Sequence, residues 1–410
     1  MTSVIFYFQV HQPFRLDQKF KDQLAKKKYE LKDLENLYFN DHFNKEIFLR
    51  VAKKCYLPAN DTWLKVIDEN RNSKKKVKIS YSLSGTVLEQ AERYQPDVID
   101  SFKSLAKTGC VEFLSETYYH SLTSLYGIKK DEFIEQINLH KQAMHDLLGI
   151  TPQSFRNTEL ILNNSIMKTI ADQGFKGILS EGIKFILPEN KSPDFVFNSK
   201  VAPNLKVLLR NFKLSDDIAF RFSARNWEEY PLLADKYASW LAQSTGDCIN
   251  LFMDYESLGE HMWEESGIFQ FIQHLPNEIF KFDHLHFKTP SEVFDELPVK
   301  NQIDIGDFGT ISWADDRDVG AWLRNKYQTK SFEKQKQLEL QIKKLGNPIL
   351  LKLWRMLTTS DHLYYISQAD AGPGEVHSYF SHYDNPMTAY TNYNEIIDDL
   401  SHRVKELSMK

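Results

Sequence analysis

The chain has 410 residues, of which 42% are hydrophobic and 13% aromatic, and its formal net charge is −5 at pH 7. A chain of this length can bury a sizeable core, but it is too long for one ordinary small domain. Its slightly acidic balance supplies no basic field that would hold nucleic acid or an anionic membrane, so we expect neither as a partner.

The cysteines and the first residues of the chain indicate the cellular compartment of the protein. Three cysteines, Cys55, Cys110 and Cys248, lie far apart without CxxC spacing, which argues against a disulfide framework or a structural zinc site. The opening MTSVIFYFQVHQPF lacks a basic region and a small-residue cleavage site, so it predicts a first strand rather than a signal peptide. No apolar run approaches the length of a membrane span. We therefore expect a cytoplasmic protein.

Short apolar runs recur along the chain, and most are followed at once by a polar residue that can take part in chemistry. Helical segments alternate with these runs, which predicts a parallel α/β barrel, closed or nearly closed, with its site at the carboxyl ends of the strands. Leu285–Phe287 is a candidate eighth strand. The seven other predicted strands are Val4–Val10, Val77–Tyr81, Val111–Leu114, Ser154–Arg156, Gly177–Leu179, Lys206–Leu209 and Ile249–Met253.

Helices and loops are predicted between these strands. Asp131–Leu148 has apolar residues at helical spacing, Asn164–Gln173 begins with a capping Asn, and Pro231–Ala242 has Pro in its first turn. Two stretches break the alternation. Asp17–Asn60 is long and charged and predicts inserted helices, and Ile186–Pro203 predicts a loop over the site face.

The character of the chain changes past Pro290. Charged, apolar and amphipathic helices are predicted in turn at Ser331–Leu345, Ile349–Thr359 and Asn392–Leu407. We therefore predict a barrel domain over residues 1–290 and a helical domain over residues 291–410 that completes the cleft.

Several of the predicted strands end beside a carboxylate. Glycoside hydrolysis needs two such groups, one to attack or stabilise the sugar carbon and one, kept protonated, to donate to the leaving oxygen. Glu159 follows the fourth strand and Asp254 the seventh, so they can meet across a barrel mouth. No GxSxG, HExxH, P-loop or GxGxxG motif precedes a suitable helix. The acids are Glu112, Glu116, Glu159, Glu181, Asp254 and Glu256.

Five stretches, in order along the chain, resemble the ordered sequence regions of glycoside hydrolase family 57, most closely those of its α-amylase-like members. The resemblance implies an incomplete (β/α)7 barrel, a following helical region, and retaining action on α-1,4-glucans or maltooligosaccharides without a cofactor. The stretches are VHQPFR at 10–15, GCVEFLSETYYHSL at 109–122, FRNTEL at 155–160, FMDYESLGEH at 252–261 and TSDHLYYIS at 359–367.

The resemblance also implies roles for single residues. Glu159 resembles the family's catalytic nucleophile, and Asp254 resembles its general acid/base. His11 resembles a residue that contacts sugar hydroxyls, Glu112 an acid that lines the same subsite, and Asp361 a cleft residue from the helical part.

Other residues, inside and outside these stretches, remain candidates for substrate contact. Glu116 competes with Glu112 for one role, and Glu256 is either a partner of Asp254 or the acid itself. Trp227 and Trp313 are candidates for stacking on sugar faces or for core packing. The polar candidates for the cleft wall are Gln12, His120, His261 and His362.

Three further functions stay open. A 4-α-glucanotransferase or a branching enzyme would use the same intermediate with a different acceptor. A metal-dependent polysaccharide deacetylase would need His11, Asp254, His261 and Glu159 as ligands, although no two histidines have the spacing of a helical metal motif. A non-catalytic glucan-binding protein is the third possibility.

Overall fold

The computed structural model describes residues 1–410 except 128, 188–191, 369–380 and 410. Within these described residues, ten strands form two mainly parallel sheets, one ordered β3-β2-β1-β8 with β9 also paired to β1, and one ordered β10-β6-β7-β5-β4. The strands are β1 Thr2–Val10, β2 Ile79–Leu83, β3 Val111–Phe113, β4 Ser154–Arg156, β5 Gly177–Glu181, β6 Val196–Ser199, β7 Lys206–Arg210, β8 Cys248–Asp254, β9 Leu285–Phe287 and β10 Val299–Ile303.

Two seams join the sheets into a ring. At the first, just beyond β3, Ser115 forms a parallel bridge with Phe155 of β4. At the second, Asn211 after β7 donates its backbone N–H to the carbonyl of Asn250 in β8, at 2.8 Å. The ring runs β1, β2, β3, β4, β5, β7, β8. The predicted incomplete (β/α)7 barrel is therefore confirmed.

All seven predicted strands occur, with small shifts at their ends. The candidate eighth strand, β9, also forms and pairs with Thr2–Val4 of β1. It uses the same edge of β1 with which β2 pairs further along, so it lies outside the ring. Part of the stretch predicted as a loop over the site face, Val196–Ser199, is instead the strand β6, antiparallel to β7. A tight return lets it do so, because Ser199 donates to the Leu205 carbonyl at 3.0 Å.

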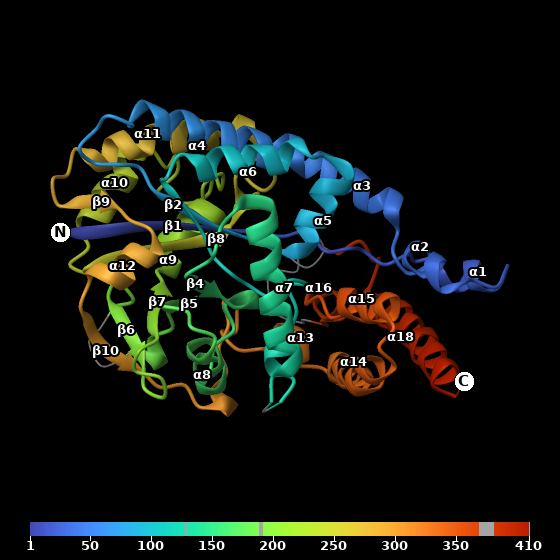
Figure 1. Ribbon diagram of the computed structural model, residues 1–410. Helices are drawn as coiled ribbons and strands as arrows, with labels where there is room; N and C mark the ends of the chain where they lie inside the picture. The colour runs from blue at the N-terminus through green and yellow to red at the C-terminus, as the bar shows by residue number, and fades with distance from the viewer. Residues whose placement is uncertain (128, 188–191, 369–380, 410) are drawn as a thin grey trace.

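Most helices up to residue 296 surround the barrel, while the short helices that follow residue 20 lie beside the C-terminal helices at one side of it (Figure 1). A π-helical turn, η2 (Ala52–Tyr56), joins α3 to α4. The helices are α1 Phe20–Leu24, α2 Leu34–Tyr38, α3 Asp41–Val51, α4 Leu57–Glu69, α5 Gly85–Tyr94, α6 Asp97–Lys107, α7 Asp131–Leu148, α8 Asn164–Asp172, α9 Phe212–Ala219, α10 Ala234–Ala242, α11 Ile268–Phe280, α12 Pro290–Glu296, α13 Gly320–Leu323, α14 Lys326–Leu345, α15 Pro348–Leu357, α16 Asp361–Tyr364 and α18 Pro386–Ser408.

Helix positions agree with the sequence better than helix starts do. α7 has the predicted bounds, but α8 is capped by Asn163, whose side chain accepts from the Ile166 N–H at 2.9 Å, and not by Asn164. The prediction that Pro231 lies in the first turn of a helix is wrong. α10 begins only at Ala234, because Leu233 still has an extended backbone.

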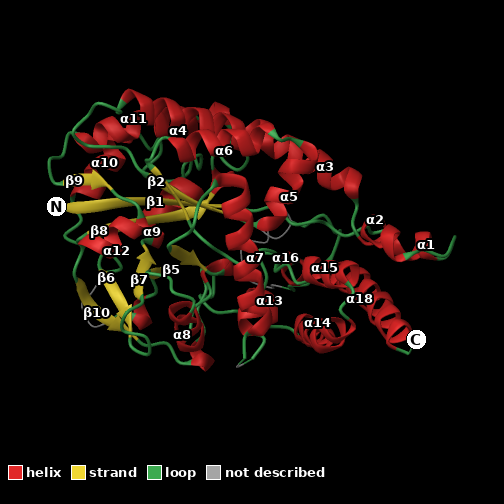
Figure 2. Cartoon of the chain, in the orientation of Figure 1, coloured by secondary structure: helices red, strands yellow, loops and turns green. Residues whose placement is uncertain are grey.

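Three apolar cores hold these elements. The first packs β1, β2 and β8 against α3, α4, α6, α10 and α11, and the second packs β4, β5 and β7 against α7, α8 and the C-terminal α14, α15 and α18. Along β1, Phe6 and Phe8 face the first core, while Ile5 and Tyr7 belong to the third, small core inside the ring. In Figures 1 and 2, α4, α6 and α11 lie along one side of the barrel, opposite α14, α15 and α18.

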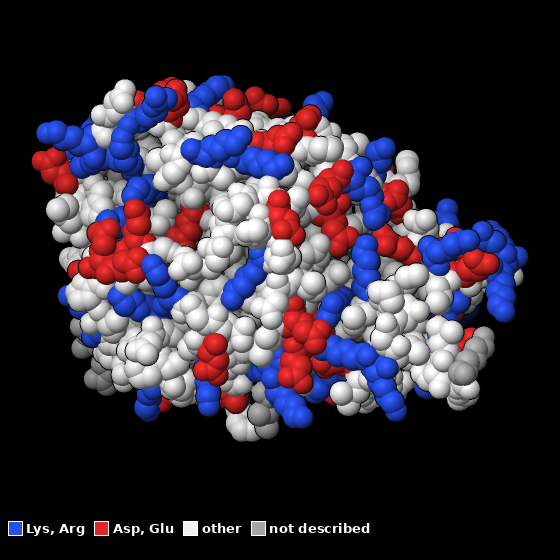
Figure 3. Space-filling model, in the orientation of Figure 1, with Lys and Arg blue, Asp and Glu red and all other residues white. Residues whose placement is uncertain are grey.

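The surface and the helix lengths agree with the composition. Figure 3 shows acidic and basic side chains interspersed across the visible face. Across the described part of the chain, no helix is both long enough and apolar enough to span a bilayer. The domain boundary at residue 290 stays a prediction. One strand from beyond it, β10, pairs with β6 of the barrel part.

Candidate active site

The candidate nucleophile lies in a short turn, Thr158–Leu160, directly after β4. Glu159 and Leu160 have φ of 57° and 52°, in the left-handed region that residues other than glycine rarely adopt. The turn is held from a distant segment, because Ile311 pairs with Leu162 and the Trp313 N–H donates to the Glu159 carbonyl at 3.2 Å. Tertiary contacts thus hold an unfavourable backbone in place, as is common at functional sites.

Polar groups surround the Glu159 carboxylate. The Trp313 Nε1–H donates to Oε2 at 2.6 Å and the Ser360 hydroxyl to Oε1 at 3.2 Å, while His120 Nε2 lies 3.5 Å from Oε1. Burial alone would raise the pKa of Glu159, but the bond and charge of His120 and the charge of Arg156 bring it below its ordinary value. The group is therefore ionised at neutral pH.

Asp254, the last residue of β8, has the opposite character. Burial, followed by the charge of Glu159, raises the pKa of Asp254 to about 6, against the lowering effect of Arg156 and His120. Two carboxyls within electrostatic reach of each other thus differ: Glu159 ionises below its ordinary pKa, and Asp254 keeps its proton up to about pH 6. Such a split is what an acid and a nucleophile in one site need.

Glu256 lies two residues beyond Asp254 and is buried. The Tyr56 hydroxyl donates to its Oε1 at 2.5 Å, and Gln12 Nε2 lies 3.4 Å from the same oxygen. Burial and the charge of Asp254 raise the pKa of Glu256 to about 8. Tyr56 comes from η2, so the predicted helical insertion reaches the site.

His11 and Asp361 join the barrel to the C-terminal helices. His11 Nε2 lies 3.0 Å from Asp361 Oδ2, and Nδ1 lies 2.8 Å from the Ser84 hydroxyl. The His11 ring stacks on His120 with centroids 4.0 Å apart. Burial and the charge of His120 lower the pKa of His11, so its neutral ring can donate Nε2–H to Asp361.

Of the two competing acids of the second motif, Glu116 lies in this cluster. Its Oε2 is 2.8 Å from His120 Nδ1. Glu112 instead accepts from the Ser154 hydroxyl at 2.6 Å and from the Ser291 N–H, at the start of α12, at 2.8 Å. Because β3 ends at Phe113, the two acids do not lie on one strand, and their side chains point to different surroundings.

Three further candidates lie among structural contacts. Trp227 packs against Trp240 with ring centroids 6.2 Å apart, in the first core. The His362 ring packs on Tyr393, at 5.5 Å between centroids, and burial lowers its pKa to about 4. Burial also lowers the pKa of His261 to about 4, and the backbone N–H of His261 donates to the Glu256 carbonyl at 2.9 Å.

Arg156 lies in the third motif but was not among the predicted site residues. Its side chain is fully buried, and its guanidinium lies 4.8 Å from the centre of the Trp313 ring. Glu181 forms a separate ion-pair group with Arg210 at 3.1 Å and Arg317 at 2.9 Å. The contacts of Arg156 with Trp313 and of Glu181 with Arg317 join segments far apart in sequence, so no local pattern predicts them. For Arg156, its place in the polar motif FRNTEL was the available sign of a functional role.

The metal alternative depends on whether its donors gather. Within the described residues, no group of three or more His, Cys, Asp and Glu side chains is placed to hold a metal ion. His11, Asp254, His261 and Glu159 therefore do not form the ligand set that a deacetylase would need.

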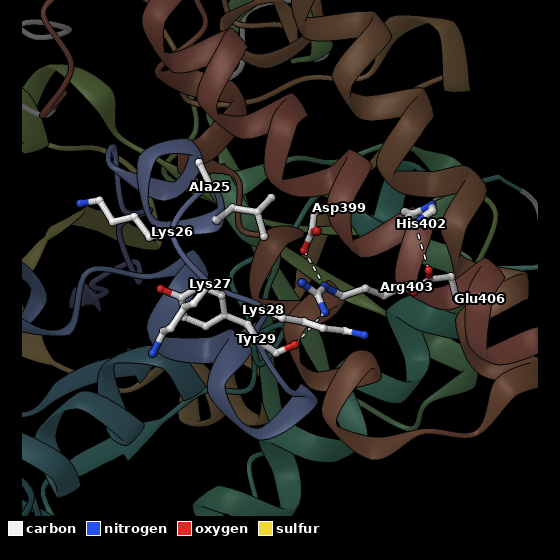
Figure 4. A pocket seen from close by; sticks show the side chains of 10 residues that line it. Ala25, Lys26, Lys27, Lys28, Tyr29, Asp399, His402, Arg403 and Glu406 are labelled. Carbon is white, nitrogen blue, oxygen red and sulfur yellow. Dashed lines mark hydrogen bonds and ion pairs between the residues drawn. The ribbon is translucent and has the colours of Figure 1, made fainter.

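A cavity of about 410 Å³ lies elsewhere, between Leu24–Tyr29 and α18. Figure 4 shows Arg403 held there between the Asp399 carboxylate, at 2.7 Å, and the Tyr29 carbonyl, at 3.2 Å. None of the predicted site residues lines this cavity.

Comparison with known proteins agrees with this geometry. The model of glycosyl hydrolase family 57 matches residues 5–306. A Methanocaldococcus jannaschii protein named "Putative alpha-amylase" is 46% identical over 416 residues, which cover 99% of this chain and 86% of that one.

Solved structures add the fold alone, because their identities are low. A family 57 branching enzyme from Thermococcus kodakaraensis has a TM-score of 0.67 at 12% identity, covering 98% of this chain and 90% of that chain. A 4-alpha-glucanotransferase from Thermococcus litoralis has a TM-score of 0.58 at 18% identity, covering 92% and 54%. With the family match over most of its length, the chain belongs to glycosyl hydrolase family 57 and is a glycoside hydrolase that resembles α-amylases in sequence.

Proposed function

We propose that the protein is a retaining hydrolase of α-1,4-glucans, with Glu159 as nucleophile and Asp254 as general acid/base. One observation carries the proposal: the low pKa of Glu159 beside the pKa of about 6 of Asp254. The substrate class comes from the relatives, which are named as an α-amylase, a glucanotransferase and a branching enzyme.

The reaction has two steps. Glu159 attacks the anomeric carbon, the glycosidic bond breaks, and Asp254 gives its proton to the leaving oxygen. Asp254, now ionised, then takes a proton from a water that attacks the same carbon, and the electron pair of the ester bond returns to Glu159. Two displacements on one carbon retain its configuration.

The first experiment follows maltoheptaose with purified protein, by chromatography and anomeric NMR, with and without a chelator. We expect shorter products that first appear as the α-anomer, unaffected by the chelator. Glu159→Gln keeps the size of the side chain but removes its charge, so it should lower kcat at least about 1,000-fold.

Other outcomes would change the assignment. Initial β-anomer would contradict the retaining mechanism, and unchanged turnover in Glu159→Gln would remove Glu159 from the nucleophile role. Loss of cleavage with chelator would show that the hydrolysis needs a metal ion, which the two-carboxylate mechanism does not require.

A second candidate is a 4-α-glucanotransferase or branching enzyme on the same scaffold. The observation that favours it is the fold shared with two enzymes of these names. Products longer than maltoheptaose, or new branch points in the NMR spectrum, would establish it, because they need a sugar acceptor in place of water.

A further inference from the structure

A buried chain of three groups leads to the candidate nucleophile. Glu116 and His120 are fully and almost fully buried, at 0% and 3% exposure of their side chains, and Nδ1 of the ring lies 2.8 Å from Glu116 Oε2. The other ring nitrogen lies 3.5 Å from Glu159 Oε1. The imidazole thus stands between two carboxylates, one closed off from water and one at the site.

Neighbouring groups fix both ends of this chain. Gln9 Nε2 donates to the second Glu116 oxygen at 2.8 Å, so each oxygen of that carboxylate has a partner. His120 has a φ of 48°, and its ring stacks on His11, which restricts the ring plane. Burying Glu116 as a charge would be costly without such partners.

We propose that Glu116 is a positioning residue that keeps His120 protonated, with Nε2–H directed at Glu159, and that this charge speeds breakdown of the glycosyl-enzyme. The proposal rests on the proposed function. In the breakdown step the ester bond to Glu159 breaks and its electron pair returns to the carboxylate. A cation beside that oxygen stabilises the departing carboxylate, but it also makes the free carboxylate a weaker nucleophile.

Charge states support this arrangement. Burial lowers the pKa of His120, but the bonds of Glu116 and Glu159 outweigh it and raise the pKa to about 9. The same pairing, with contributions from His140 and Arg156, holds the pKa of Glu116 at about 2 against the effect of burial. The charged and titratable groups that face or influence His120 are Glu116, Glu159, Arg156, His11, Asp361 and Asp254.

The first test does not depend on any substrate. NMR titration of the His120 ring should give a midpoint near pH 9 in the wild type and at least about one unit lower in Glu116→Gln, because one charged partner is gone. Glu112→Gln is the matched control. Glu112 lies in the same segment as Glu116, but its carboxylate accepts hydrogen bonds from Ser154 and Ser291. Removing its charge should therefore leave the midpoint of the His120 titration unchanged.

The second test separates the two steps with 4-nitrophenyl maltooligosaccharides, whose leaving group needs little protonation. In Glu116→Gln we expect a burst of nitrophenol, a kcat lowered about tenfold or more, and a similarly lower KM, because the intermediate accumulates. The ratio kcat/KM reports the first step and should not fall, because a carboxylate without the neighbouring cation is a stronger nucleophile.

Each result decides something. An unchanged titration midpoint in Glu116→Gln overturns the proposal. A shifted midpoint with kcat and kcat/KM falling together overturns the role in breakdown, since a merely structural defect would lower both. If the wild type cleaves no glucan, the kinetic role fails with the proposed function, while the titration still decides whether Glu116 holds the charge. Circular dichroism of the variants would identify a folding defect, and His120→Gln then gives a second variant for the same burst measurement.

Discussion

Asp254 and Glu256 are neighbours at the end of β8, and the pKa of each lies above its ordinary value, at about 6 and about 8. The motif alone left open which of them donates the proton. A general acid acts only while it is protonated, so the pH at which activity declines distinguishes them.

We predict that kcat/KM declines above about pH 6, with the pKa of Asp254, in the wild type and in Glu256→Gln alike. The sign follows from the role: the protonated fraction of Asp254 falls as pH rises through its pKa, while Glu256 is still neutral there. Initial rates from pH 4 to 9 would measure both profiles. A decline near pH 8 that vanishes in Glu256→Gln would make Glu256 the acid.

At the same scale, the sequence located the carboxylates but not their partners. Glu159 and Asp254 follow predicted strands, so topology alone brings them to one edge. The bond from Trp313 to Glu159 spans 154 positions, and it gives Trp313 a different contact from the sugar stacking proposed for it. No local pattern reports a contact over that separation.

At the scale of elements, one glycine allows the π-helical turn η2 to pack closely against the loop that follows Glu256. Gly259 has a φ of 103°, and a Cβ there would lie 2.0 Å from the carbonyl oxygen of Lys54 in η2. Gly267 also has a positive φ, 85°, but nothing lies within 4 Å of the position of its Cβ. The two positions share backbone strain and differ in packing.

We predict that Gly259→Ala destabilises the protein more than Gly267→Ala. Gly267→Ala should lower the free energy of unfolding by about 1–2 kcal/mol, through backbone strain alone. Gly259→Ala should add about 1–3 kcal/mol for the clash. Denaturant unfolding of both variants measures the difference, and equal losses would mean that η2 does not press on this loop.

Predictions of elements were most accurate where apolar residues decided the structure. Most of the ring strands are runs of buried residues, and α7 buries one face at helical spacing. β10, with the sequence VKNQI, was missed because it is an edge strand with mostly exposed residues. β6 was missed because a loop rich in Pro, Asn and Lys surrounds its few apolar residues.

At the scale of the whole molecule, the second core crosses the predicted domain boundary. It joins β4, β5 and β7 to α14, α15 and α18, and the segment beyond residue 306 also supplies Trp313, Ser360 and Asp361 to the site. The helical part therefore covers apolar surface that the barrel alone would expose.

We predict that a fragment of residues 1–306 does not fold stably, because half of its barrel would lose the cover of the C-terminal helices. Size-exclusion chromatography and thermal unfolding would show aggregation or the absence of a cooperative transition. A monomeric fragment that unfolds cooperatively would instead support an independent barrel domain.

The two seams of the ring give catalysis a particular sensitivity. Glu159 follows β4 in one sheet and Asp254 ends β8 in the other, and a few backbone and side-chain hydrogen bonds join the sheets at each seam. Each sheet has its own large core, so slight loosening at a seam would leave helix content and most burial intact. It would nevertheless move the two carboxyls apart. The rate of the enzyme is thus more sensitive to the relative position of the two sheets than any spectroscopic measure of secondary structure. Storage or mild heating should therefore inactivate the enzyme well before it unfolds.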